Sequence, residues 1–255
     1  MRILYPSLAR LFLFLCVAQA GIAAAATYVV VSMVGSQLTI VLAEQVTGSR
    51  TDKNHYDVRP LSDPILDATA LTAAKVSIEK VQPGASVVTL RVKDPKLLVL
   101  QDTWFERDTI AAPELLELLK GEIDNDPTTR LILISSHRAE PHLKTTHGSV
   151  GTGHVSGLGF YVDRFTFGSR SDTGEKGWGF FAPFASLRMT LVDPRSLAIE
   201  SEKFIAAGWA YSSVQAEDRD PWHAVSNKEK IRVLQNLLTD EIAQTTQILL
   251  SEQRR

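Results

Sequence analysis

Cysteine is nearly absent from this chain: of 255 residues only Cys16 is one, and it lies close to the N-terminus. If the first residues are removed, as argued below, the mature chain has no thiol. It can then form no disulfide, bind no metal through a thiolate and use no cysteine nucleophile. Its stability must come from an ordinary hydrophobic core, which a chain of this length can bury.

Long apolar runs and clusters of basic residues are also lacking. The apolar run at residues 11–17 is shorter than the about 20 residues that span a membrane, so we predict no transmembrane segment in the mature chain. Without Arg2 and Arg10, 25 basic residues face 29 acidic ones, a formal net charge of −4. The chain has no run of lysine or arginine of the kind that is typical of nucleic-acid-binding proteins, so nucleic acid is not an expected partner.

The first 26 residues have the layout of a secretory signal peptide. Arg2 and Arg10 form a basic region, residues 11–17 an apolar core, and residues 23–26 are alanines. Leu15 is too large to precede a lipidated cysteine, which argues against a lipoprotein signal. We therefore predict cleavage near Ala26 and an extracytoplasmic protein, periplasmic or secreted, made of residues 27–255.

The first half of the mature chain alternates strands with helices. Two β-branched runs, residues 28–34 and 38–43, flank Gly35-Ser36-Gln37 and predict an N-terminal β-hairpin. Apolar residues at helical spacing predict one helix that begins at Pro64, with Asp63 as a possible cap, and stops at Pro83-Gly84, and a second over 113–126. Strands are predicted at 86–92 and 131–136, which favours two helices packed on a sheet.

The second half is rich in predicted strands. Residues 179–193 and 196–211 read as strands, and apolar residues at helical spacing follow a capping box that begins at Ser226. This predicts a C-terminal amphipathic helix. The fold class is therefore α/β (or α+β), a single mixed-sheet domain over residues 27–255.

Histidines and glycines are concentrated between residues 130 and 167. Imidazole and carboxylate groups bind zinc and other divalent metals, so this stretch is a candidate metal site. The candidate ligands are His137, His142, His147, His154 and Asp163, with Glu140 as a further carboxylate. The spacing matches no standard ligand signature, and the alternative of solvated loop histidines is favoured.

The glycines of this stretch resemble those of an anion-binding loop. Arg138, Gly151 and Gly153 are the candidate residues, because glycine lets backbone N–H groups approach an anion. An anion loop usually opens a helix, whereas a strand is predicted after Gly157. Glycines that shape turns and a β-bulge are the favoured alternative.

Aromatic residues gather at residues 177–184. Trp178, Phe180 and Phe181 are candidates for a partner surface, since exposed aromatics anchor interfaces. The alternative is a strand that enters the core. Pro183 indicates an edge strand or a bulge, because proline cannot donate a ladder hydrogen bond.

These observations favour a non-catalytic extracytoplasmic protein that acts in binding or envelope assembly, with no cofactor. Its partner is an unknown protein or a second copy of the chain. The alternative is a metal-dependent hydrolase of a phosphoryl or acyl ester, which would use the histidine-rich loop 137–154 and zinc or another divalent metal. That alternative requires the histidines to converge on one point.

Overall fold

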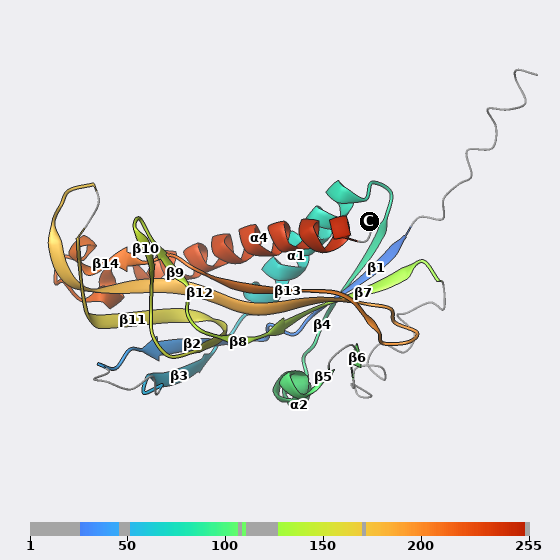
Figure 1. The fold of residues 1–255 in the computed structure, drawn as a ribbon, viewed down its shortest axis with the longest axis horizontal. Helices are drawn as coiled ribbons and strands as arrows, with labels where there is room; N and C mark the ends of the chain where they lie inside the picture. The colour runs from blue at the N-terminus through green and yellow to red at the C-terminus, as the bar shows by residue number, and fades with distance from the viewer. Residues whose placement is uncertain (1–25, 46–51, 107–108, 111–126, 170–171, 253–255) are drawn as a thin grey trace, which may run out of the picture.

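A computed structural model describes residues 26–45, 52–106, 109–110, 127–169 and 172–252. They form a large mixed sheet with the main order β3-β2-β11-β12-β7-β1-β4 (Figure 1). The strands joined in it are β1 (Thr27–Ser32), β2 (Gln37–Leu42), β3 (His55–Pro60), β4 (Ser86–Arg91), β7 (Thr129–Ser136), β8 (Arg138–Ala139), β11 (Val155–Ser169), β12 (Lys176–Val192), β13 (Ile199–Gly208) and β14 (Tyr211–Ser212). The shorter elements are β5 (Phe105–Glu106), β6 (Thr109–Ile110), β9 (Leu143–Thr145), β10 (Gly148–Val150), η1 (Gln101–Thr103), η2 (Ser213–Gln215) and η3 (Pro221–His223).

Helices α1 (Ile65–Val81) and α4 (Asn227–Glu252) lie together on one face of the sheet (Figure 1). Each presents an apolar stripe at a spacing of three to four residues, which places those side chains on one side of the helix. The buried members of the two stripes include Leu66, Ala70, Ala74, Ile78, Leu234, Leu238, Ile242 and Leu249. The short helix α2 (Pro95–Leu100) lies on the other face, where Leu97 packs against Val29 and Val31.

Strand β12 joins the two halves of the sheet. Along one edge it pairs first with β11, up to Ser186 opposite Gly157, and then with β7, from Leu187 opposite Ser136. Along its other edge it pairs with β14 and then β13. The parallel strands β7, β1 and β4 are therefore attached at one end of β12, and β11, β2 and β3 at the other.

The structure confirms the mixed α/β class, the helix at 65–81, the β-rich second half and the C-terminal helix. The predicted N-terminal hairpin is wrong in its pairing. β1 pairs in parallel with β4 and β7, whereas β2 pairs with β11 and β3. Both runs are apolar at successive positions, and such strands need a neighbour on each edge and cover on each face. The predicted helix over 113–126 lies outside the described residues.

The junction of β2 and β11 depends on Gly159. A Cβ atom at this position would overlap the carbonyl oxygen of Thr39 and lie 2.9 Å from the ring of Phe184. Gly159→Ala should therefore destabilise the fold by on the order of 3 kcal/mol, since forced overpacking separates paired strands. Urea unfolding measures the loss. Gly168→Ala is the matched control, because a Cβ there meets nothing within 4 Å; equal loss in both variants would contradict the prediction.

Candidate functional site

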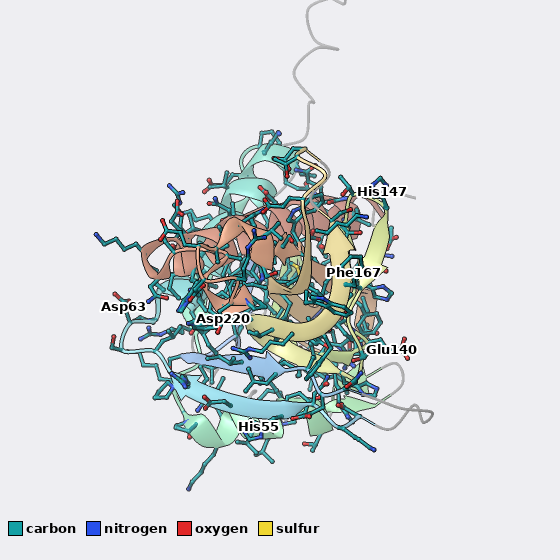
Figure 2. All side chains as sticks on the ribbon, turned by 90° about the vertical axis from the view of Figure 1, so that its left-hand side faces the viewer. His55, Asp63, Glu140, His147, Phe167 and Asp220 are labelled. Atoms are coloured by element: carbon teal, nitrogen blue, oxygen red, sulfur yellow. The ribbon has the colours of Figure 1, made fainter. Side chains whose placement is uncertain are left out.

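The four histidines of the predicted metal site lie in different surroundings. His137 follows β7, where its N–H donates to the Ser186 carbonyl at 3.0 Å and its ring packs 4.4 Å from that of Phe204. His142 and His147 are exposed, and Figure 2 shows His147 well apart from Glu140. His154 lies beside Asp52, with its Nδ1 3.2 Å from Oδ2.

These side chains do not converge. Within the part of the chain that the structure describes, no three His, Cys, Asp or Glu side chains are grouped so that they could hold a metal ion. The residues His137, His142, His147, His154 and Asp163 all belong to that part. The convergence required by the metal-dependent hydrolase is therefore not found.

The Asp163 carboxylate accepts hydrogen bonds from the backbone of its own strand, β11. Its Oδ1 accepts the N–H groups of Phe165 at 2.6 Å and Thr166 at 2.7 Å, and its Oδ2 accepts the Thr166 hydroxyl at 2.9 Å. The pairing of β11 with β12 shifts register between Asp163 and Phe167, so the carboxylate stabilises a β-bulge. The predicted metal ligand thus shapes a strand, because the bulge leaves N–H groups without ladder partners.

The predicted anion loop is filled by a carboxylate of the same chain. Asp52 Oδ2 accepts the backbone N–H of His154 at 3.1 Å and the hydroxyl of Tyr56 at 2.5 Å, and Arg138 lies 3.7 Å from it. A Cβ at Gly153, whose φ is +76°, would lie 2.5 Å from Asp52 Oδ1. Gly153 therefore admits Asp52, and in this structure the Asp52 carboxylate lies against the loop where an external anion was predicted.

This network changes two pKa values. Burial acts to raise the pKa of Asp52, but hydrogen bonds from Tyr56, the Asn54 N–H and His154 outweigh burial and hold it below its usual range. Burial and the neighbouring Asp52 carboxylate raise the pKa of Tyr56 to about 12. The network around the Asp52 carboxylate therefore joins the segment that enters β3 to the loop before β11.

A groove of about 510 Å³ lies between the β9–β10 hairpin and the distal part of the β11–β12 hairpin. Figure 2 shows His147 and Phe167, from these two hairpins, on the same side of the molecule. The lining mixes hydroxyl, aromatic, aliphatic and small residues with one carboxylate, one imidazole and one amide: Thr145, Thr146, His147, Val150, Thr166, Phe167, Gly168, Ser169, Asp172, Gly179, Phe180, Trp209, Ala210, Ser212 and Gln215.

The predicted aromatic partner surface is only partly a surface. Trp178 is 63% exposed, but Phe180 is 6% exposed and Phe181 is fully buried, so these two belong to the core. The exposed rings of the groove are Phe167, at 54%, and Trp209, at 46%. Neither ring was predicted from the sequence. Phe167 could have been found by pairing β11 with β12, which places it opposite Trp178; in the structure these two rings lie 5.1 Å apart.

The direction of the β11–β12 hairpin follows from the Asp163 bulge and from Gly179. Gly179 has a φ of +88°, and a Cβ there would meet the Asp163 carbonyl and lie 2.6 Å from Pro221. Bulges bend and twist the strand that carries them. The strand beyond the bulge thereby brings Phe167 to the side of the groove.

Comparison with known proteins identifies no family. No protein-family model matches the sequence, and no curated protein is significantly similar to it. A solved structure described as a neuraminyllactose-binding hemagglutinin homologue from Helicobacter pylori is similar over 88% of this chain and 83% of its own, with 8% identity and a TM-score of 0.35. A TM-score of this size does not establish a shared fold.

Removal of the Asp163 carboxylate should destabilise the bulge. Asp163→Ala leaves two backbone N–H groups without their acceptor and should lower the free energy of unfolding by about 2 kcal/mol. Urea unfolding measures this, and Asp163→Asn is the conservative comparison because its amide oxygen can still accept. If the alanine and asparagine variants were both as stable as the natural chain, the carboxylate would not stabilise the bulge.

Asp52 should make stability depend on pH in the acid range. Because its pKa is lower in the folded chain than in the unfolded chain, its contribution is present above the unfolded value, about 3.9, and is lost as the pH falls through the folded value. Asp52→Asn should cost about 2 kcal/mol near neutral pH, and progressively less as the pH falls below the unfolded value and through the folded one.

Unfolding free energies of both proteins across this pH range test the prediction. Asp57→Asn is the control, since the exposed Asp57 carboxylate pairs with Arg59 and should matter by less than about 1 kcal/mol at any pH. An Asp52→Asn cost that stayed constant down to acid pH would contradict the account.

Proposed function

We propose that this chain is a non-catalytic extracytoplasmic binding protein whose ligand lies in the groove between the β9–β10 and β11–β12 hairpins. The ligand class that the groove fits best is an uncharged, hydroxyl-rich molecule with an apolar face, such as a saccharide. The observation that carries the proposal is the pair of exposed rings, Phe167 and Trp209, in a groove whose lining also includes five hydroxyl side chains.

The chemistry of the lining supports this ligand class. Aromatic rings bury a large apolar area and tend to pack against flat apolar surfaces, while hydroxyl groups both donate and accept hydrogen bonds. Five hydroxyl residues line the groove: Thr145, Thr146, Thr166, Ser169 and Ser212. A saccharide presents C–H groups on the face of its ring and hydroxyls around the rim, which match the two kinds of lining residue. Ligand sites are commonly concave and mix apolar walls with a few polar groups.

The same lining favours binding over bond cleavage. Among the described residues around the groove, Asp172 is the one carboxylate and His147 the one imidazole. Glycoside hydrolysis usually uses two carboxylates that flank the scissile bond. A groove with one carboxylate and several hydroxyls is better suited to holding a saccharide than to cleaving it.

The proposed location rests on the sequence. The basic, apolar and small-residue regions of the first 26 residues have the signal-peptide layout, and the predicted mature chain has no cysteine. In the described part of the chain, no helix is long and apolar enough to span a bilayer. We accordingly propose export to the periplasm or the medium, where saccharides of the cell envelope and of the surroundings are within reach.

Calorimetric titration of residues 27–255 with a panel of neutral oligosaccharides tests the proposal. Phe167→Ala and Trp209→Ala should each weaken binding about tenfold, since a ring stacked on a ligand contributes about 1–1.5 kcal/mol. Phe165→Ala is the matched control. Phe165 is 43% exposed on the same strand, yet it does not line the groove, so its removal should leave binding unchanged.

A parallel titration with neutral peptides separates the two parts of the proposal. If peptides bind and their affinity falls in Phe167→Ala but not in Phe165→Ala, the groove is the site and the saccharide class is wrong. If neither panel binds, or if binding is insensitive to both groove variants, the groove is not the binding site.

A further inference from the structure

A second pocket, of about 210 Å³, lies where the parallel strands β1 and β4 end. Helix α1, which leads into β4, covers one face of the sheet, and α2, which follows β4, lies on the other (Figure 1). In open α/β sheets, ligands commonly bind beyond the carboxyl ends of the strands. The pocket is lined by Ser36, Leu61, Ser62, Pro64, Asp67, Arg91, Val92, Lys93 and Leu98.

Two cations line this pocket. Arg91 is the last residue of β4, and Lys93 follows after the buried Val92. Residues two apart in an extended chain point to the same side, which agrees with both lining the pocket. Among the described residues, neither Arg91 nor Lys93 forms a salt bridge. Both charges are therefore available to a ligand.

Neutral donors lie beside these cations. Helix α1 begins at Ile65. Its N-cap residue is Pro64, whose side chain cannot accept a hydrogen bond, so the N–H groups of the first turn have no side-chain cap. Ser36 and Ser62 add two hydroxyls to the lining. Asp63 is exposed and does not line the pocket; it lies at the margin of the molecule in Figure 2.

The pocket also contains one buried carboxyl group. Asp67 is 1% exposed, and its Oδ1 accepts the Ser32 hydroxyl at 2.5 Å and the Gly35 N–H at 3.2 Å. Its Oδ2 accepts no hydrogen bond from a described residue. Burial raises the pKa of Asp67, and the charge of Arg91 opposes that rise. The pocket thus offers several donors and, at its buried side, one acceptor.

We propose that this pocket binds a phosphate group that carries a proton, either free phosphate or a small monoester. Arg91, Lys93, the start of α1 and the two serine hydroxyls would hold the negative oxygens. The P–O–H group of the phosphate would donate to Asp67 Oδ2. The pocket is smaller than the roughly 300–1,000 Å³ of sites for drug-sized ligands, so it fits the phosphate group with a short attached chain.

The Asp67 acceptor predicts a choice between two anions of similar shape. At about pH 6 phosphate carries a proton that it can donate, whereas sulfate carries none. Sulfate would place an oxygen lone pair against the carboxylate and leave it without a donor, a loss typical of an unmet charged hydrogen bond. The natural chain should therefore bind phosphate at least about tenfold more tightly than sulfate.

The test is calorimetric titration of residues 27–255 at about pH 6 and constant ionic strength. The probes are inorganic phosphate, glycerol 3-phosphate and sulfate. Arg91→Gln and Lys93→Gln should each weaken phosphate binding, Arg91→Gln by at least about tenfold. Lys96→Gln is the matched control, because Lys96 lies on α2 outside the pocket and should not matter. Asp67→Asn should bring sulfate binding up to the level of phosphate, because its amide can donate.

Circular dichroism confirms that each variant is folded, and the opposite effects expected of Arg91→Gln and Asp67→Asn cannot both follow from unfolding. Tighter binding of glycerol 3-phosphate than of phosphate supports a monoester as the ligand, and the reverse order supports the free ion. Absence of saturable phosphate binding, equal phosphate and sulfate affinities in the natural chain, or full binding by Arg91→Gln would overturn the proposal. These results do not depend on the aromatic groove.

Discussion

The pairing of β12 on both of its edges is the constraint on which the structure depends. Its 17 residues bond to β11 and β7 in succession on one side and to β14 and β13 on the other. One strand therefore joins the parallel strands β7, β1 and β4 to a mixed part in which β11 pairs with β2 in parallel and β2 with β3 in antiparallel. Helices α1 and α4 then cover one face of the sheet, so loss of the β12 ladder would expose the core beneath both helices. The two proposed sites lie one in each part: the phosphate pocket at the ends of β1 and β4, and the aromatic groove beside the β11–β12 hairpin.

At two predicted ligand sites, a carboxylate of the chain binds neighbouring groups of the chain. Asp52 occupies the glycine loop, and Asp163 satisfies the bulge of β11. In both cases a carboxylate accepts backbone N–H groups that would otherwise lack partners, which is the usual role of a buried acid. The pocket lined by Arg91 and Lys93 differs. Among the described residues neither cation forms a salt bridge, although the charge of Arg91 acts on Asp67, and Asp67 Oδ2 accepts no hydrogen bond from a described residue.

Periodicity predicted the elements well and their pairing poorly. The spacing of Leu66, Ala70, Ala74 and Ile78 is enough to predict α1, since a helix is a local structure. The partner of β1 is not a local matter. Its successive apolar residues, such as Val30 and Val31, cover both faces in a hairpin and in a parallel sheet alike, and only the later β4 and β7 decide between them. The groove could not be predicted either, because Phe167 and Trp209 line one pocket only in the folded chain, where β11 carries a bulge. The favoured reading of Phe180 and Phe181 as core residues was correct, as hydrophobic runs in paired strands usually are buried.

The most direct test of a binding function for the groove is the set of tryptophan indole N–H signals in a nitrogen-15 NMR spectrum of residues 27–255, recorded with and without neutral oligosaccharides. Trp209 lines the groove, whereas Trp104 is 2% exposed and lies in a separate part of the core. The account predicts a saturable shift of the Trp209 signal while the Trp104 signal stays in place. Saturable binding that leaves the Trp209 signal unmoved would contradict it, because the ligand would then lie elsewhere on the molecule.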